Sequence, residues 1–176
     1  IQFLLFFVLL IKAVDEYQDL LRVSVATAGN DHRLGANEAP PAIISMFLGD
    51  ELSGILESYE NGVEYVPVKV QPMETGVAAV PRFQKDTTDR NRTSPFAFTG
   101  NKFEFRMLGS ASSISGPNTV MNTIVADAIS YIADELEKAD DVTAKAKEMI
   151  RDLATKHKRI IFNGNNYSDE WVREAE

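Results

Sequence analysis

The side chains best suited to chemistry lie close together in the stretch 89–106. Its second half alternates Phe with charged residues, so that Glu104 stands between Lys102 and Arg106 at a spacing of two. Residues i and i+2 of a strand share a face, which predicts one apolar face and one face with a carboxylate between two cations. Such a face could bind an anionic ligand together with a metal ion. It could equally be a plain ladder of ion pairs, since exposed pairs are common and weak.

Further charged residues occur in two polar segments. Arg33 and Glu38 lie in a loop rich in Gly, Asn and Pro, and Arg90 and Arg92 lie just before the alternating strand. A planar, permanently charged guanidinium suits bidentate binding of carboxylate and phosphate. The simpler alternatives are that Arg33 pairs with Glu38 across its loop and that Arg90 pairs with a neighbouring aspartate.

Composition narrows the possible functions. The net charge of −8 and the lack of a basic stripe argue against a nucleic-acid surface. The chain has no cysteine, which excludes disulfides and thiolate chemistry. It has no Gly-rich phosphate loop, and its two histidines have no second His or Cys at ligand spacing, so a zinc site is not expected. Any phosphate would therefore be held by Arg, Lys and a metal ion.

The pattern of apolar residues predicts a mixed α/β fold, in which an antiparallel sheet carries the ligand-binding residues and helices cover its other face. We expect one long helix over 2–28, a loop over 30–41, a short strand over 42–48 and a helix over 51–59. Residues 63–84 read as irregular chain or a short hairpin. The apolar run at 1–11 is too short for a membrane span, so we expect a helix of a larger protein that chain outside this sequence covers, and no membrane role.

The chain after the alternating strand is predicted to be helical. A stripe of apolar residues at helical spacing runs from Pro117, where helices often begin, to about Ala139. Asp141 or Thr143 is expected to cap a further helix that ends near His157. That helix should turn four side chains inward, namely Ala146, Met149, Ile150 and Leu153.

Four segments resemble the type III glutamine synthetases. They are Arg33-Leu34-Gly35-Ala36-Asn37-Glu38-Ala39-Pro40, the block from Asp89 to Lys102, Phe103-Glu104-Phe105-Arg106, and the helix after Pro117-Asn118. The two Arg-containing blocks, in this order, are highly specific. The resemblance runs along the whole chain. It implies that residues 1–176 are the C-terminal part of a glutamine synthetase catalytic domain, with about 140–176 as a peripheral helical segment.

This resemblance implies an enzyme that ligates ammonia to glutamate through a γ-glutamyl phosphate, with ATP as co-substrate and Mg²⁺ or Mn²⁺ as cofactor. It also implies a cytoplasmic protein that forms a ring-shaped homo-oligomer. Two alternatives stay open: a γ-glutamyl ligase that uses another amine, and a non-catalytic relative that builds or regulates an oligomer.

The resemblance assigns roles to the residues that match its motifs. Arg33 matches the arginine that grips the glutamate α-carboxylate, and Arg106 matches one that faces substrate and phosphate. Arg92 matches an arginine that neutralises the transferring phosphate. Glu38 matches a carboxylate that closes over bound glutamate and takes a proton from ammonium, and Glu104 matches a metal ligand.

Other positions correspond less directly. Lys102 stands where the family has a basic residue near the nucleotide. Ala97 stands where the family has a second phosphate-binding arginine, so Arg90 or another residue would supply that charge. The interval from Arg33 to Glu38 is one residue shorter than in the common bacterial enzymes. The other metal ligands lie upstream in the family, before residue 1, so we expect the isolated piece to be inactive.

Overall fold

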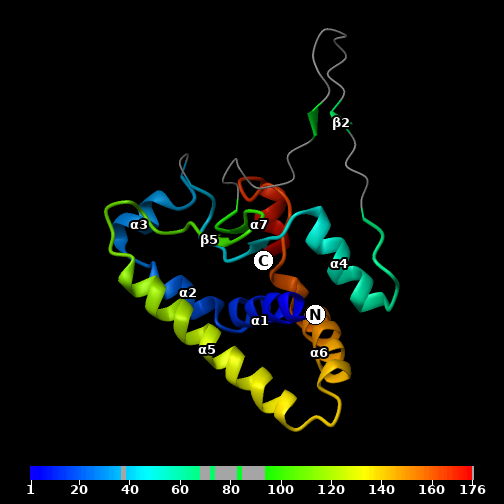
Figure 1. Ribbon diagram of the computed structural model, residues 1–176. Coiled ribbons are helices and arrows are strands. Elements are labelled where there is room, and N and C mark those ends of the chain that lie inside the picture. Colours follow the sequence, from blue (N-terminus) through cyan, green and yellow to red (C-terminus); the bar gives the residue numbers. More distant parts are fainter. Residues whose placement is uncertain (37–38, 68–71, 74–82, 85–93, 176) are drawn as a thin grey trace.

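The computed structural model describes residues 1–36, 39–67, 72–73, 83–84 and 94–175, and these form a helical body around a small sheet (Figure 1). The helices are α1 (Gln2–Glu16), α2 (Gln18–Ser24), α3 (Ala28–Arg33), α4 (Asp50–Asn61), α5 (Ser115–Glu137), α6 (Val142–His157), the 3₁₀ helix η1 (Lys158–Ile160) and α7 (Asp169–Ala175). The strands are β1 (Met46–Phe47), β2 (Pro72–Met73), β3 (Phe83–Gln84), β4 (Phe96–Phe98) and β5 (Phe103–Phe105). Among the described helices, none combines the length and the apolar character that crossing a membrane requires.

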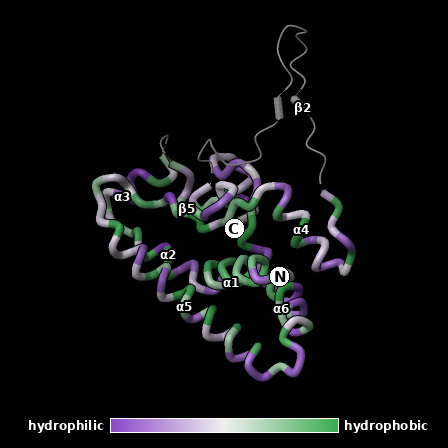
Figure 2. The backbone as a smooth tube through the Cα atoms, in the orientation of Figure 1, coloured by the Kyte–Doolittle hydropathy of each residue, from purple (hydrophilic) through white to green (hydrophobic). Residues whose placement is uncertain are grey.

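The body is built around α1, which packs against both α5 and α6 (Figure 1). Its apolar residues recur at helical spacing, and the side chains of Val8, Ile11 and Val14 are fully buried. Figure 2 shows the hydrophobic colour along most of this helix. Because a buried aliphatic side chain contributes about 1.5–3 kcal/mol, α1 is the main hydrophobic element of the core. Phe3 and Phe6 of this helix are exposed, and the expectation that chain outside this sequence covers it stays a prediction.

The single helix predicted over 2–28 is wrong. The helix breaks at Tyr17, whose φ of −115° and ψ of 25° are not helical, and again at Val25. A new helix, α3, then begins behind Thr27, whose side chain accepts a hydrogen bond from the backbone N–H of Asn30 at 3.3 Å. The apolar period continues through both breaks, so periodicity alone could not locate them, whereas the capping threonine was a usable signal. The loop predicted from residue 30 accordingly starts only after α3 ends at Arg33.

The sheet that carries the alternating strand is mixed and not purely antiparallel, which corrects the prediction. Its order is β1-β4-β5, with β1 parallel to β4 and β4 antiparallel to β5. The tight connection between β4 and β5 requires antiparallel pairing, and it passes through Gly100 at a φ of 98°, where a side chain would be strained. Strand β1 reaches β4 from a distant part of the sequence, and alternation does not encode the direction of such a partner. The described residues also include a separate two-stranded antiparallel sheet of β2 and β3.

The other helix predictions are confirmed with small shifts in their ends. Helix α4 occupies 50–61, α5 includes Pro117 in its first turn, and α6 occupies 142–157. The four side chains predicted to face inward from α6 are buried, with exposed fractions of 0–5%. Asp141 is the N-cap of α6, and its Oδ1 accepts hydrogen bonds from the backbone N–H groups of Thr143 at 2.9 Å and Ala144 at 3.0 Å.

Replacing Asp141 with alanine should destabilise the first turn of α6. Two backbone N–H groups lose their acceptor, and an N-cap of this kind contributes about 1 kcal/mol. We expect the amides at the start of α6 to exchange with deuterium about fivefold faster. The neighbouring Asp140→Ala variant is the control, because its exposed side chain is not the cap. Equal exchange in the two variants would show that the cap does not hold the helix.

Candidate active site

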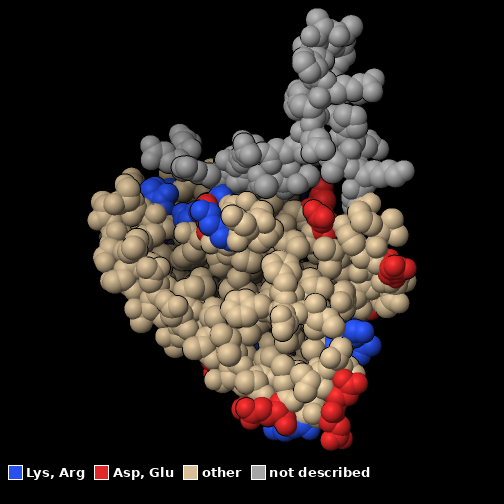
Figure 3. All heavy atoms as spheres, in the orientation of Figure 1, with Lys and Arg blue, Asp and Glu red and all other residues tan. Residues whose placement is uncertain are grey.

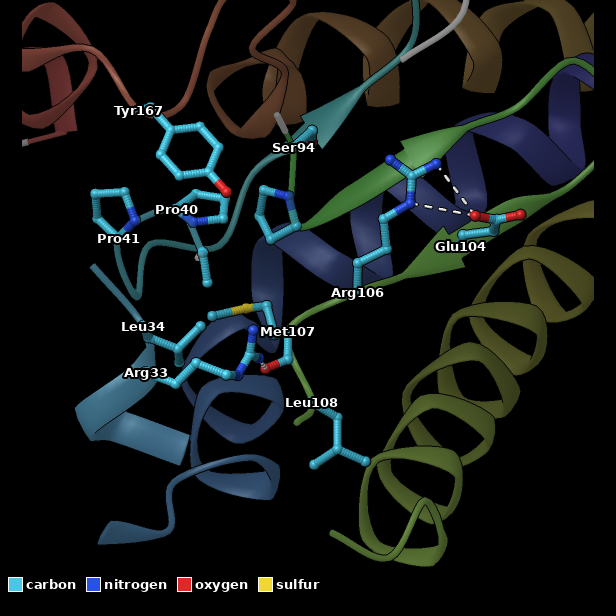
Figure 4. A pocket seen from close by; sticks show the side chains of 12 residues that line it. Arg33, Leu34, Pro40, Pro41, Ser94, Glu104, Arg106, Met107, Leu108 and Tyr167 are labelled. Atoms are coloured by element: carbon cyan, nitrogen blue, oxygen red, sulfur yellow. Dashed lines mark hydrogen bonds and ion pairs between the residues drawn. The ribbon is translucent and has the colours of Figure 1, made fainter. Parts of the chain in front are cut away.

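A pocket of about 330 Å³ opens where α3, the chain after it, β5 and the segment before α7 meet (Figure 4). It is lined by Arg33, Leu34, Ala39, Pro40, Pro41, Ser94, Pro95, Glu104, Arg106, Met107, Leu108 and Tyr167. Three of the residues predicted to act together, Arg33, Glu104 and Arg106, therefore line one pocket although they come from distant parts of the chain. Lys102 is not part of the lining, although its Nζ lies 3.3 Å from Glu104 Oε1.

Strand β5 has the apolar face and the charged face that its alternating sequence predicts. Phe103 and Phe105 pack on the rings of β4, with centroid separations of 5.5 Å from Phe96 to Phe103 and 5.7 Å from Phe96 to Phe105. Phe98 also lies 5.2 Å from Phe103. This aromatic cluster fixes the strand from its apolar side, so Glu104 is presented on the opposite side, toward the pocket.

Glu104 is held as a carboxylate by the cations on either side of it. Arg106 donates to Oε2 from Nη2 at 3.1 Å and from Nε at 3.2 Å, and Lys102 Nζ lies 3.3 Å from Oε1. These hydrogen bonds, first that of Arg106 and then that of Lys102, hold the pKa of Glu104 below its usual range. The side chain keeps 40% of its surface exposed, so the ionised carboxylate remains accessible from the pocket. The ion pairs that the sequence suggested as an alternative to ligand binding are present, and they leave the pocket side of Glu104 exposed.

The described residues do not make a metal site by themselves. A hard divalent cation takes six or more oxygen ligands, usually with several carboxylates among them. Within the part of the chain that the structure describes, no three His, Asp or Glu side chains gather in a way that could hold a metal ion. Glu104 could supply one ligand only, and it already contacts two cations.

Arg33 is fixed at the opposite side of the pocket (Figure 4). Its Nη2 donates to the backbone carbonyl of Met107 at 2.6 Å and to Asn30 Oδ1 at 3.1 Å, and its Nε donates to the same Oδ1 at 3.2 Å. Among the described residues, Nη1 makes no hydrogen bond. A guanidinium that is held on one side and open on the other is suited to binding an anionic group.

Basic side chains gather on the face of the molecule near α3 and β5, with an acidic side chain among them (Figure 3). The pocket thus combines guanidinium groups and one carboxylate against a lining of Pro, Leu and Met side chains. Charged groups in a partly enclosed apolar surrounding act more strongly than in open water. The arrangement can bind a small molecule with more than one anionic group.

Some predicted site residues lie outside the described residues, namely Glu38, Arg90 and Arg92. Ala97 is fully buried in β4, where it pairs with Glu104, so this position offers no charge to the pocket. The pairing of Arg33 with Glu38 and the partner of Arg90 therefore stay predictions.

Sequence reasoning missed two polar residues of the site. Asn30 is predicted to lie in the loop over 30–41, yet it lies inside α3 and accepts a hydrogen bond from Arg33. The i to i+3 spacing of these two residues was a usable signal, because such residues are neighbours on a helix. Tyr167 lines the pocket from the far end of the chain, and nothing in its local sequence indicates this.

Comparisons with known proteins match nearly the whole chain. Residues 145–176 match the family described as the glutamine synthetase C-terminal domain. The chain is 47% identical over 173 residues to the type-3 glutamine synthetase of Dictyostelium discoideum, covering 97% of this chain and 24% of that protein. It is 50% identical over 184 residues to a glutamine synthetase of Butyrivibrio fibrisolvens and 41% identical over 180 residues to one of Bacteroides fragilis (strain YCH46). These matches cover 99% and 98% of this chain, and the chain spans about a quarter of the length of all three relatives.

Proposed function

We propose, from the premise that this chain belongs to the glutamine synthetase family, that the protein of which it forms a part ligates ammonia to glutamate with ATP. Identities of 41–50% to three proteins of that name support the premise. The observation that carries the proposal is the meeting of Arg33, Glu104 and Arg106 at one pocket. In this proposal the γ-carboxylate of glutamate attacks the γ-phosphorus of ATP and ADP leaves. Ammonia then attacks the acyl phosphate and phosphate leaves.

Arg33 and Arg106 have the chemistry that this reaction needs. Arg33 is proposed to bind the α-carboxylate of glutamate through Nη1, since its other nitrogens are held by Asn30 and Met107. Arg106 is proposed to face the substrate and the phosphate. Phosphoryl transfer depends largely on positioning and charge neutralisation, and guanidinium groups that are fixed beforehand provide both.

The remaining assignments rest on the resemblance alone. Glu104 is proposed as one ligand of a Mg²⁺ or Mn²⁺ site that residues outside the described chain complete. Glu38 is proposed to take the proton from ammonium, which needs a carboxylate in a closed, water-poor place. Arg92 is proposed to neutralise the transferring phosphate, and Arg92, Lys102 and Arg90 are proposed to contact the nucleotide. The assembly into a ring, the cytoplasmic location and the inactivity of the isolated piece also stay predictions.

Replacing Arg33 with alanine in the whole protein should chiefly raise the KM for glutamate. Hydrogen bonds to a charged group contribute about 1.5–3 kcal/mol, which corresponds to a rise of about 10- to 100-fold. We expect kcat to change little and the KM for ATP to stay the same. Steady-state glutamine formation with glutamate varied at saturating ATP and ammonium measures this.

The matched control is Arg22→Ala, because Arg22 is a part-buried arginine that pairs with Asp31 at 2.7 Å and does not line the pocket. A KM for glutamate that is the same in both variants would remove Arg33 from the substrate site. Turnover with ammonium compared with a panel of primary amines would then separate an ammonia ligase from a ligase for another amine.

A further inference from the structure

Asn30 is the buried centre of a hydrogen-bond network at the edge of the pocket. Asn30 is only 4% exposed, and its side chain makes four hydrogen bonds. Nδ2 donates to the carbonyl of Val25 at 2.8 Å and to that of Met107 at 3.1 Å, while Oδ1 accepts both bonds from Arg33. A carboxamide has two N–H donors and two acceptor sites, so every one of them is used. Its orientation is also fixed, because the guanidinium can only donate and the carbonyls can only accept.

The side chains of Asn30 and Arg33 and the carbonyl of Met107 are all hydrogen-bonded to one another. The carbonyl of Met107 accepts from both Asn30 and Arg33, so α3 and the chain that follows β5 are bonded through one oxygen. Arg106 and Met107 are neighbours in the chain, so the same bonds set the distance between the two arginines of the pocket. An arginine that is fixed before the ligand arrives loses less conformational freedom on binding, which increases affinity.

We propose that Asn30 is a positioning residue for substrate binding. Its amide holds the guanidinium of Arg33 against the Met107 carbonyl, so that Nη1 faces the pocket and meets the carboxylate of the substrate. This inference rests on the proposed function, in which Arg33 binds glutamate. It adds a residue that touches no substrate and acts through Arg33.

Gly109 lies directly against the side chains of Asn30 and Arg33. A Cβ atom at this position would lie 3.2 Å from Asn30 Oδ1 and 3.4 Å from Arg33 Nε. Contacts this short are uncommon, so an added methyl group would displace the amide, the guanidinium or both. Gly109 thus offers a way to disturb the network without removing any of its hydrogen-bonding groups.

The decisive experiment is a double-mutant cycle in the whole protein, with the KM for glutamate as the readout. Asn30→Ala should raise this KM by about tenfold, because Arg33 loses a charged hydrogen bond that orients it. In an Arg33→Ala background the same change should alter the KM by less than about twofold, since the group that Asn30 positions is gone. In both backgrounds we expect kcat and the KM for ATP to change less than the KM for glutamate.

Each outcome has a defined meaning. An Asn30→Ala effect of equal size in both backgrounds would overturn the positioning role, because a purely structural residue acts independently of Arg33. An Arg33→Ala variant with an unchanged KM for glutamate would instead overturn the proposed function of Arg33, and this inference with it. The two failures are therefore distinguishable.

Gly109→Ala keeps the test valid if the Asn30→Ala protein does not fold. It should raise the KM for glutamate severalfold, and this effect should also vanish in the Arg33→Ala background. Gly29→Ala is the matched control, since Gly29 lies in α3 and an added Cβ there would meet no atom within 4 Å. If the two glycine variants give the same KM, the network does not position Arg33.

Discussion

Replacing Glu104 with alanine in the whole protein should reduce glutamine formation by about 10²–10³-fold, because a preorganised charged group at a reaction centre has an effect of this size. The loss has two causes. The pocket loses its one carboxylate among the described residues, and Arg106 loses the acceptor that holds Nε and Nη2 at 3.2 and 3.1 Å. Steady-state rates at saturating glutamate, ATP and ammonium measure the loss of glutamine formation. Titration with Mn²⁺ by calorimetry measures the contribution of Glu104 to metal binding.

The control for Glu104 is Glu135→Ala on α5. Glu135 also lies between two cations, with Lys138 Nζ at 3.1 Å and Lys145 Nζ at 3.9 Å, but it is remote from the pocket. Full activity in this variant together with a large loss in Glu104→Ala would separate a site residue from an ordinary surface ion pair. Unchanged activity in Glu104→Ala would reject the assigned role. If activity falls while Mn²⁺ affinity is unchanged, Glu104 acts by orienting Arg106 and is not a metal ligand.

The half of the site that lies on β5 could be predicted from the sequence. Alternation of Phe with Lys102, Glu104 and Arg106 is a local pattern, and the pleat of a strand converts it directly into two faces. The approach of Arg33 to this strand could not be derived in that way. It depends on the end of α3 and on hydrogen bonds to the Met107 carbonyl, which join residues far apart in the chain. For Arg33 the resemblance to a family supplied the expectation, and the pocket now supports it.

Helix prediction failed where polar residues determine the structure. The apolar period of residues 2–28 is continuous, but the helix is interrupted at Tyr17, and a new helix begins after the N-cap residue Thr27. Periodicity also gave no reason to expect an acid inside the core. Asp15 lies on α1 with an exposed fraction of 3%, and by its type it reads as a surface residue. Its burial depends on a partner from the other end of the chain, which no local pattern reveals.

Asp15 is bonded to two residues that follow more than a hundred positions later. Its Oδ2 lies 2.7 Å from Nδ1 of His157, which is 1% exposed, and its Oδ1 accepts from Arg159 Nε at 2.7 Å. The second ring nitrogen of His157 is buried and has no hydrogen-bond partner among the described residues, and Glu16 Oε1 lies 3.7 Å from it. Buried charged groups persist only where they are paired, so this cluster bonds α1 to the end of α6 and to η1.

The Asp15→Ala variant should destabilise the packing of α1 on α6 by about 1–3 kcal/mol, because it leaves the buried side chain of His157 without its hydrogen-bond partner. His157 would lose its acceptor, and Arg159 would lose the carboxylate through which it bonds η1 to α1. We expect the amides of α1 and α6 to exchange with deuterium about 10- to 100-fold faster in the whole protein.

The control is Asp152→Ala, since Asp152 lies on α6, its side chain is 59% exposed and it pairs with the exposed Arg151. That change should alter exchange by less than about twofold, as surface pairs contribute little. The double variant Asp15→Ala/His157→Ala should lose far less stability than the sum of the losses in the two single variants, because both substitutions remove the same contact. Additive effects, or equal exchange in the Asp15 and Asp152 variants, would mean that apolar packing alone holds α1 on α6.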